Sequence, residues 1–463
     1  MRTLSACLLL LGLVGCSTTR PHGMDAREAT RDEVPLPFIQ DDYERALAEA
    51  KAKGVPLFVH AMAGWCITCR SMKAQVLSSP SLGRHAGRFV WLELSTDLSQ
   101  NAAFQRKFPV DSWPKLYVID PREEKALLRF SDSLTVAGLE QFLDEGERAY
   151  RGGAAGLDAL LVQADALHAR GRVVEAAQVL TEVLAKAPAD WPRRGRVMLT
   201  LLDSLYETGT ASGMKACATK ALELLPGTPR SLMWAHGARR GLACAQSILP
   251  EEPEAQGVEA LLSALEEKVV EAMGAPSIDM SADDRALLYR ARVWAREMAK
   301  DEVGGTRVAE AWMTFLEAEA AKAPTPWIRT LLDSHRADGA LRLKTPERAI
   351  PALMRSEEEF PRDYLAPLRL AHLYQSQGRL EDALAATDRA LAVAQGPRRV
   401  SVMSIRARIF LERNDNATAA RTLRDALSYS ETLPEVQRPM CSVTRLKREL
   451  AQLEALPQVA PSK

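Results

Sequence analysis

The stretch Gly64-Trp65-Cys66-Ile67-Thr68-Cys69-Arg70 decides how the first part of this chain folds. It follows an apolar run at 55–59 and precedes a segment of helical composition at 71–77. A strand that leads into a helix here places the first cysteine beside unpaired N–H groups and the positive end of the helix dipole, which favour thiolate over thiol. We therefore predict that Cys66 is a nucleophile and that Cys69 is the resolving thiol of a dithiol/disulfide pair.

The residues around this stretch predict an alternation of strands and helices. A short amphipathic helix is expected over 41–53, and the helix that carries the two cysteines is expected to end near residue 79. The other expected elements are a strand at 89–94, a helix at 101–107, a hairpin of 116–119 with 126–130, and a closing helix at 135–150. This order is the one that a thioredoxin fold requires.

Over residues 38–150 the chain resembles the thioredoxin superfamily, especially the thioredoxin-like modules of bacterial envelope proteins and the C-terminal domain of DsbD-type reductases. The resemblance rests on the Trp-Cys-x-x-Cys motif and on Trp113-Pro114, which directly precedes the strand at 116–119. It implies thiol–disulfide exchange, a cis Pro114 facing the cysteines, and substrate contacts from Trp65, Trp113 and Pro114. The alternative is a trans proline at a strand start. Trp113 and Lys115 depart from the family's usual residues, which favours a narrow choice of substrate.

A second departure concerns the proton transfer that serves the resolving thiol. In the family, a buried aspartate before the first cysteine pairs with a lysine on the next strand. The matching positions here hold His60 and Glu93. The resemblance therefore implies a His/Glu pair in which imidazole acts as the base at neutral pH. The alternative is that His60 is a core histidine bonded to the backbone.

Two alternatives to redox exchange are open for the motif cysteines, an inert disulfide and metal binding. The pair would be inert if it formed a permanent disulfide in an inactive thioredoxin fold. Cys66, Cys69, His60 and Met62 would suit copper as soft ligands, but no second CxxC or histidine pair completes a zinc set. We predict no metal and no cofactor.

Three cysteines lie in the C-terminal part of the chain. Cys217 and Cys244 fall on successive predicted helices, where small buried unpaired cysteines are more usual than a disulfide. Cys441 is expected to be a spare thiol.

From residue 155 onward the strand pattern ends and a period of about 34 residues begins, with small residues and a glycine at fixed offsets. Ala371, Tyr374, Gly378, Ala383 and Ala390 form the clearest unit. The pattern resembles tetratricopeptide (TPR) repeats at 155–229 and 330–455, with a degenerate stretch at 230–329. The expected fold is therefore an α/β thioredoxin-like domain followed by an all-α TPR-like helical-repeat solenoid. In that family such repeats bind peptides or partner proteins; the alternative is a rigid spacer.

The N-terminus has the features of a bacterial lipoprotein signal. Residues 1–15 combine a positive start with an apolar run too short to span a bilayer. Leu13-Val14-Gly15-Cys16 resembles a lipobox, which implies lipidation at Cys16, and Ser17 implies anchoring in the outer membrane. Residues 16–37 are expected to be a polar tether. The alternative is an ordinary secretory signal.

Composition excludes some classes of partner. Lys+Arg and Asp+Glu number 60 each, so charge gives no case for nucleic acid or an anionic membrane surface. We expect a thiol–disulfide oxidoreductase of the cell envelope, acting on envelope proteins that carry thiols or disulfides, with the repeats binding a protein or peptide. The competing hypothesis is a non-enzymatic scaffold with a thioredoxin-fold docking module.

Overall fold

The computed structural model describes residues 36–153 and 155–455. The predicted signal at 1–15, the lipidation site Cys16 and most of the tether lie outside the described residues. Within those ranges, no helix is both long enough and apolar enough to cross a bilayer.

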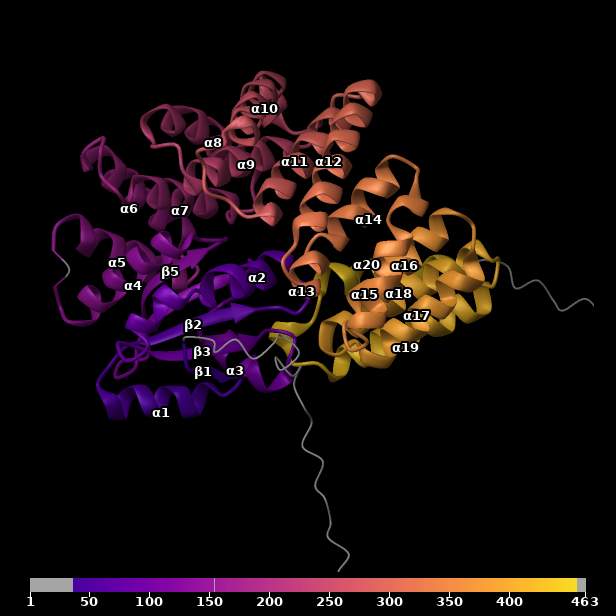
Figure 1. Cartoon of the computed structure of the whole chain (residues 1–463), viewed down its shortest axis with the longest axis horizontal. Coiled ribbons are helices and arrows are strands. Elements are labelled where there is room, and N and C mark those ends of the chain that lie inside the picture. Colours follow the sequence, from indigo (N-terminus) through magenta and orange to yellow (C-terminus); the bar gives the residue numbers. More distant parts are fainter. Residues whose placement is uncertain (1–35, 154, 456–463) are drawn as a thin grey trace, which may run out of the picture. The chain divides into compact units, whose positions relative to one another are not determined.

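A five-stranded mixed sheet forms the centre of the N-terminal part (Figure 1). Its strands lie in the order β1-β3-β2-β4-β5. Their bounds are β1 (Phe38–Gln40), β2 (Leu57–Met62), β3 (Val90–Ser95), β4 (Lys115–Asp120) and β5 (Lys125–Ser131). The first three strands in this order are parallel, and β4 and β5 run antiparallel to their neighbours. Every residue of β2 is buried, because both faces of the sheet are covered.

Two layers of helices cover the sheet. They are α1 (Tyr43–Lys53) and α3 (Ala102–Lys107) on one face, and α2 (Ile67–Ser71) and α4 (Val136–Tyr150) on the other. A π-helical stretch, Met72–Leu77, continues α2. All elements predicted from the sequence in this part are present, which confirms the thioredoxin-like fold. The sequence analysis missed β1, because three residues are too short to show a period.

The rest of the described chain is helical. In order, the helices are α5 (Leu157–Ala169), α6 (Val173–Lys186), α7 (Arg194–Tyr206), α8 (Ala211–Leu224), α9 (Leu232–Gln246), α10 (Val258–Gly274), α11 (Ala282–Met298), α12 (Glu302–Lys322), α13 (Pro326–Thr330), α14 (Asp333–Arg342), α15 (Ile350–Glu359), α16 (Leu365–Ser376), α17 (Leu380–Val393), α18 (Gly396–Glu412), α19 (Asn416–Thr432) and α20 (Met440–Glu454). Successive helices pack against each other as pairs, such as α5 with α6 and α16 with α17.

The residues that define the repeat pattern have the packing roles expected of them. Ala371, Ala383 and Ala390 are fully buried where helices α16 and α17 meet. Gly378 has a positive φ of 70° in the turn between these helices, a conformation that glycine adopts without strain. Small side chains therefore permit close helix pairing, and glycine permits the turn.

Cys217 and Cys244 correct one expectation. The sequence favoured two unpaired buried cysteines, but a disulfide joins them between α8 and α9. Their Cα atoms lie 6.0 Å apart, within the usual range for a disulfide. Sequence spacing alone did not reveal how closely the two helices approach.

Buried charges join the sheet to the first helices of the repeat region. Strand β5 packs against α5. Arg129 on β5 lies 3.5 Å from Glu207, and Glu145 on α4 pairs with Arg193 at 2.9 Å and with Arg196. The expected boundary near residues 150–155 is thus a change of secondary structure within a single compact unit.

Candidate active site

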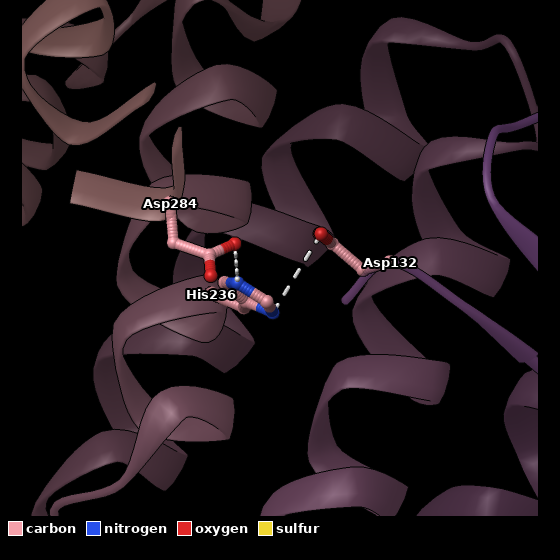
Figure 2. Close-up of side chains that lie close together, drawn as sticks. All are labelled: Asp132, His236 and Asp284. Carbon is pink, nitrogen blue, oxygen red and sulfur yellow. Dashed lines mark hydrogen bonds and ion pairs between the residues drawn. The ribbon is translucent and has the colours of Figure 1, made fainter. Parts of the chain in front are cut away.

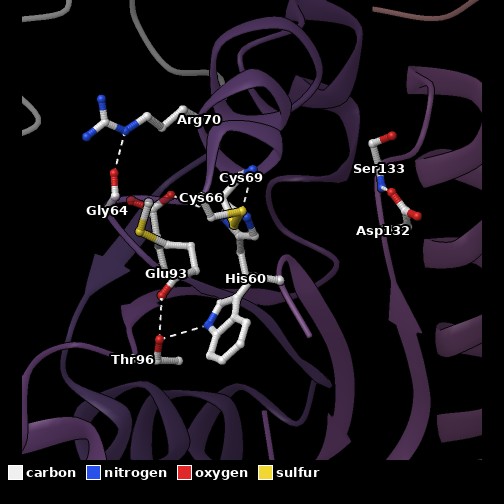
Figure 3. The surroundings of a disulfide bond; sticks show 11 residues. His60, Gly64, Cys66, Cys69, Arg70, Glu93, Thr96, Asp132 and Ser133 are labelled. Atoms are coloured by element: carbon white, nitrogen blue, oxygen red, sulfur yellow. Dashed lines mark hydrogen bonds and ion pairs between the residues drawn. A yellow bond between two sulfur atoms is a disulfide. The ribbon is translucent and has the colours of Figure 1, made fainter. Parts of the chain in front are cut away.

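The two motif cysteines form a disulfide at the start of α2 (Figure 3). Cys66 is the N-cap residue, and its Sγ accepts a hydrogen bond from the backbone N–H of Cys69 at 3.0 Å. This places the first sulfur where an unpaired helix N–H stabilises negative charge. The helix start that the sequence predicted for Cys66 is present.

Two tryptophans cover the cysteine pair. The Trp113–Pro114 peptide is cis, as the resemblance implied. The rings of Trp65 and Trp113 meet edge to face with centroids 5.1 Å apart, and both pack against the buried cluster that Cys66 and Cys69 form with Met62 and Ala63. Trp113 Nε1 donates a hydrogen bond to Thr96 Oγ1 at 2.8 Å, which fixes the ring orientation. The walls of this site are therefore aromatic and apolar.

A buried charged group lies on the strands that lead to the site. His60 on β2 and Glu93 on β3 are register neighbours, and His60 Nδ1 lies 3.3 Å from Glu93 Oε2. Lys73 donates to the other carboxylate oxygen at 2.5 Å. Burial alone would raise the pKa of Glu93, but the bond to His60 and the charge of Lys73 outweigh it and lower the pKa to about 2.

His60 retains one free nitrogen. Its Nε2 is buried and has no hydrogen-bond partner among the residues that the structure describes. A buried imidazole held by a carboxylate at Nδ1 has the second nitrogen available to take or give a proton. The predicted His60–Glu93 contact is thus present. The sequence analysis did not predict Lys73, although it lies on the π-helical turn after the motif.

The C-terminal helices close over this site. Cys66 is 5% exposed and Cys69 is fully buried. Arg70 donates to both carboxylate oxygens of Asp363, at 2.5 and 3.0 Å, and its guanidinium lies over the ring of Trp327. Trp65 and Ile67 pack against the core of the helices α11 to α19. The disulfide therefore lies beneath a cover made by the chain itself.

A second set of contacts ties α18 to the loop after β3. The Arg398 guanidinium lies 4.5 Å from the centre of the Trp65 ring, and its Nε lies 3.2 Å from Asp97 Oδ1. Gly396 approaches so closely that an added Cβ would lie 2.2 Å from the carbonyl oxygen of Asp97. Sequence reasoning missed these contacts, because residues about three hundred positions apart carry no local signal of their pairing.

Another buried cluster lies away from the cysteines. His236 on α9 lies between two carboxylates, with Nε2 3.2 Å from Asp284 Oδ1 and Nδ1 3.7 Å from Asp132 Oδ1 (Figure 2). Asp132 also pairs with Arg239, and Asp284 accepts from Ser133 and Ser281. Each carboxylate therefore already has cationic or proton-donating partners within the protein.

The pKa values in this cluster follow from the same contacts. Burial alone would raise the pKa of Asp284, but hydrogen bonds from His236, Ser133 and Ser281 lower it to about 2. We interpret the cluster as a clamp that holds the loop after β5 against α9 and α11. The sequence analysis did not single out any of its three residues.

The N-terminal part of the chain is similar in sequence to known proteins. A family model described as thioredoxin-like matches residues 38–121. The thiol:disulfide interchange protein DsbD of Pseudoalteromonas atlantica is 28% identical over 82 residues, covering 17% of this chain and 14% of that protein. DsbD 2 of Pseudomonas aeruginosa is 28% identical over 100 residues, covering 21% of this chain and 17% of that protein. The chain thus spans less than a fifth of these relatives.

The solved structures similar to this chain include proteins with tetratricopeptide repeats. A tetratricopeptide repeat protein from Parabacteroides merdae has a TM-score of 0.42 at 12% identity, covering 64% of this chain and 98% of its own. The TPR2AB domain of yeast Sti1 in complex with pHSP90 has a TM-score of 0.25 at 11% identity, covering 64% of this chain and 98% of its own. Likenesses this weak do not establish a shared fold. For the N-terminal part, the family match and the site geometry agree that residues 38–121 form a thioredoxin-like domain.

Proposed function

We propose that this protein is a thiol–disulfide oxidoreductase whose reactive pair is Cys66 and Cys69. The observation that carries the proposal is the Cys66–Cys69 disulfide at the start of α2, in a fold that also has a cis Pro114. The similarity to two thiol:disulfide interchange proteins supports it.

The exchange proceeds in two steps from the reduced form. The Cys66 thiolate attacks one sulfur of a substrate disulfide, so that a mixed disulfide forms and the other substrate sulfur leaves as a thiolate. The Cys69 thiol then loses its proton and attacks Cys66 Sγ. This forms the bond seen here and releases the second substrate thiolate. The reverse sequence oxidises a substrate dithiol, and the redox potential decides the direction.

The neighbouring side chains have separate roles in this proposal. His60 takes the proton of Cys69, and Glu93 orients the imidazole through Nδ1. Trp65, Trp113 and Pro114 form the apolar surface on which the substrate chain lies. Because both indole rings pack against the cluster that contains the cysteines, this surface admits a narrow range of substrates.

Access to the sulfurs requires movement of the cover. At 5% exposure Cys66 cannot meet a protein disulfide, so the helices that carry Asp363 and Arg398 must separate from α2 and from the loop after β3. We propose that binding of a protein partner to the repeat region favours this open form. The partners are envelope proteins with thiols or disulfides, reached from a lipid anchor at Cys16 on the periplasmic side of the outer membrane.

The same burial favours a second function, that of a non-enzymatic scaffold whose thioredoxin-like domain only docks the repeats. Cys69→Ser separates the two hypotheses, because an enzyme lacking the resolving thiol accumulates mixed disulfides through Cys66. The experiment expresses this variant in the bacterial envelope and identifies reducible adducts by mass spectrometry. The matched control is the double variant Cys66→Ser/Cys69→Ser.

Adducts with Cys69→Ser and none with the double variant support the oxidoreductase. If neither variant forms adducts, in growing cells or after mild oxidation, the oxidoreductase is excluded and the scaffold stands.

A further inference from the structure

Lys73 bonds to the buried pair of His60 and Glu93, which lies among the residues around the disulfide (Figure 3). Its Nζ donates to Glu93 Oε1 at 2.5 Å, while His60 Nδ1 lies 3.3 Å from Glu93 Oε2. The side chain of Lys73 is 32% exposed and that of His60 is 0% exposed. A single carboxylate thus joins an ammonium group at the edge of the protein to a buried imidazole.

The balance of charge in this group decides whether His60 is able to act as a base. Glu93 is ionised at neutral pH, since its bonds to His60 and Lys73 lower its pKa to about 2 against the effect of burial. With no other partner, a buried carboxylate would hold a proton on the imidazole, because an ion pair is easier to bury than a lone charge. A histidine that is already protonated cannot accept the proton of Cys69.

Lys73 reverses this preference. Its ammonium group already balances the charge of Glu93, so a further proton on His60 would leave the buried group with an uncompensated positive charge. The neutral imidazole is therefore favoured when Lys73 is bonded to the carboxylate. Lys73 stands four residues after Cys69 on the same helical run, so the helix that carries the resolving thiol also carries the charge that acts on its base.

The other neighbours of the group do not supply a positive charge. On β4 the register partner of His60 is Leu116, which is apolar. From the end of β1 the charge of Asp41 acts on Glu93 and Lys73, but its carboxylate bonds to a backbone N–H of β3 and to a side-chain amide. A second negative charge would favour a protonated His60. The effect that keeps the imidazole neutral therefore comes from Lys73.

We propose that Lys73 is a positioning residue that keeps His60 uncharged at neutral pH and so ready to accept the proton of Cys69. The inference rests on the proposed function for the role of His60 and adds a role for Lys73. The proton passes from Cys69 Sγ to His60 Nε2, and the electron pair left on Cys69 Sγ forms the bond to Cys66 Sγ while the substrate thiolate leaves. His60 then gives the proton to water. The charge of Lys73 favours this last step, which returns the base to its neutral form.

The first test measures the protonation of His60 in the full chain as the Cys66→Ser/Cys69→Ser variant, so that it does not depend on exchange. The histidines are labelled with carbon-13 for NMR, and the signal of His60 is identified by its loss in His60→Gln. We expect Lys73→Met to raise the ratio of protonated to neutral His60 at pH 7 about tenfold or more. Lys73→Arg retains the charge and should leave the ratio close to that of the parent.

The matched control is Lys107→Met. It removes an ammonium group from Glu124, a carboxylate of the same domain whose other partners are Lys51 and Tyr43. No imidazole is bonded to Glu124 in the part of the chain that the structure describes, so this variant should leave the ratio for His60 unchanged.

The second test uses the chain with both cysteines. The mixed disulfide of Cys66 with thionitrobenzoate is formed in mild acid and brought to higher pH in a stopped-flow instrument, and absorbance follows the release of the coloured thiolate. At pH 7 Lys73→Met should slow the release about tenfold, and the rate should recover at higher pH, where His60 loses its proton. Lys73→Arg should restore the rate at pH 7.

The outcomes separate this inference from the proposed function. If Lys73→Met leaves the protonation of His60 unchanged, or raises it without slowing release, the role of Lys73 is refuted while the oxidoreductase still stands. If the parent chain forms no mixed disulfide at all, the oxidoreductase is refuted, and the role of Lys73 falls with it.

Discussion

The contact between Arg70 and Asp363 gives the sharpest test of the cover over the cysteines. Asp363→Asn removes the negative charge but retains an oxygen for the backbone N–H of Leu365. The side chains of Arg70 and Asp363 are only 5% and 15% exposed, so in the closed form the guanidinium is left with an uncompensated charge. We take this cost as about 2–3 kcal/mol. In the open form Arg70 meets water and the cost is absent.

The closed form alone is therefore destabilised, and the open population should rise roughly 30- to 150-fold. The assay follows alkylation of reduced Cys66 by iodoacetamide, with mass spectrometry, in a Cys69→Ser background. Rates are taken on the plateau above the thiol pKa, because a freed Arg70 charge also favours the thiolate. The control variant is Arg389→Gln on α17, which removes an ion pair with Glu357 away from the cysteines. An unchanged plateau rate together with a lowered melting temperature would refute the idea that this contact covers Cys66.

Three further outcomes are expected. Gly396→Ala adds a Cβ that would lie 2.2 Å from the Asp97 carbonyl oxygen, whereas the φ of 54° by itself costs alanine only about 1 kcal/mol. Because this clash pushes α18 away from the loop after β3, alkylation of Cys66 should be faster although no residue at the cysteines has changed. His60→Gln should slow release of a preformed mixed disulfide at least tenfold, as followed by stopped-flow fluorescence, and should flatten its pH dependence; unchanged release would discard the base assignment. Asp284→Asn should lower the free energy of unfolding by about 2 kcal/mol at neutral pH, and urea titrations should show this difference shrinking as pH falls from 4 towards 2. Folding lowers the pKa of Asp284 to about 2, so the ionised carboxylate stabilises the folded protein at pH values above the ordinary pKa of an aspartate. This contribution is lost when the pH falls towards 2 and the carboxyl group takes up a proton.

Most of the site was predictable because its signals are local in sequence. The cysteine spacing and the apolar run before it predicted a sulfur at a helix start, and the cap at Cys66 confirms it. The position of Pro114 before a strand predicted its cis peptide by resemblance. The His60–Glu93 contact was predictable because two parallel strands of known direction have few possible registers. The roles of these residues in exchange stay predictions.

Lys73 was not predictable in the same way. It reaches Glu93 from a π-helical turn, and the sequence analysis predicted an ordinary helix over that segment. A change from α-helix to π-helix rotates the side chains that follow it about the helix axis. No residue in Met72–Leu77 gives a sequence signal for this change.

The sequence by itself determined the elements of the sheet, the start of the helix that carries Cys66 and Cys69, and the helical repeats. These depend on hydrophobic period, capping and turn residues, which act over a few positions. Only the tertiary structure decided that the repeats cover the cysteines and that Cys217 bonds to Cys244. These features depend on how helices far apart in the chain approach each other. That approach is set by the packing of many side chains together, and no short stretch of sequence records it.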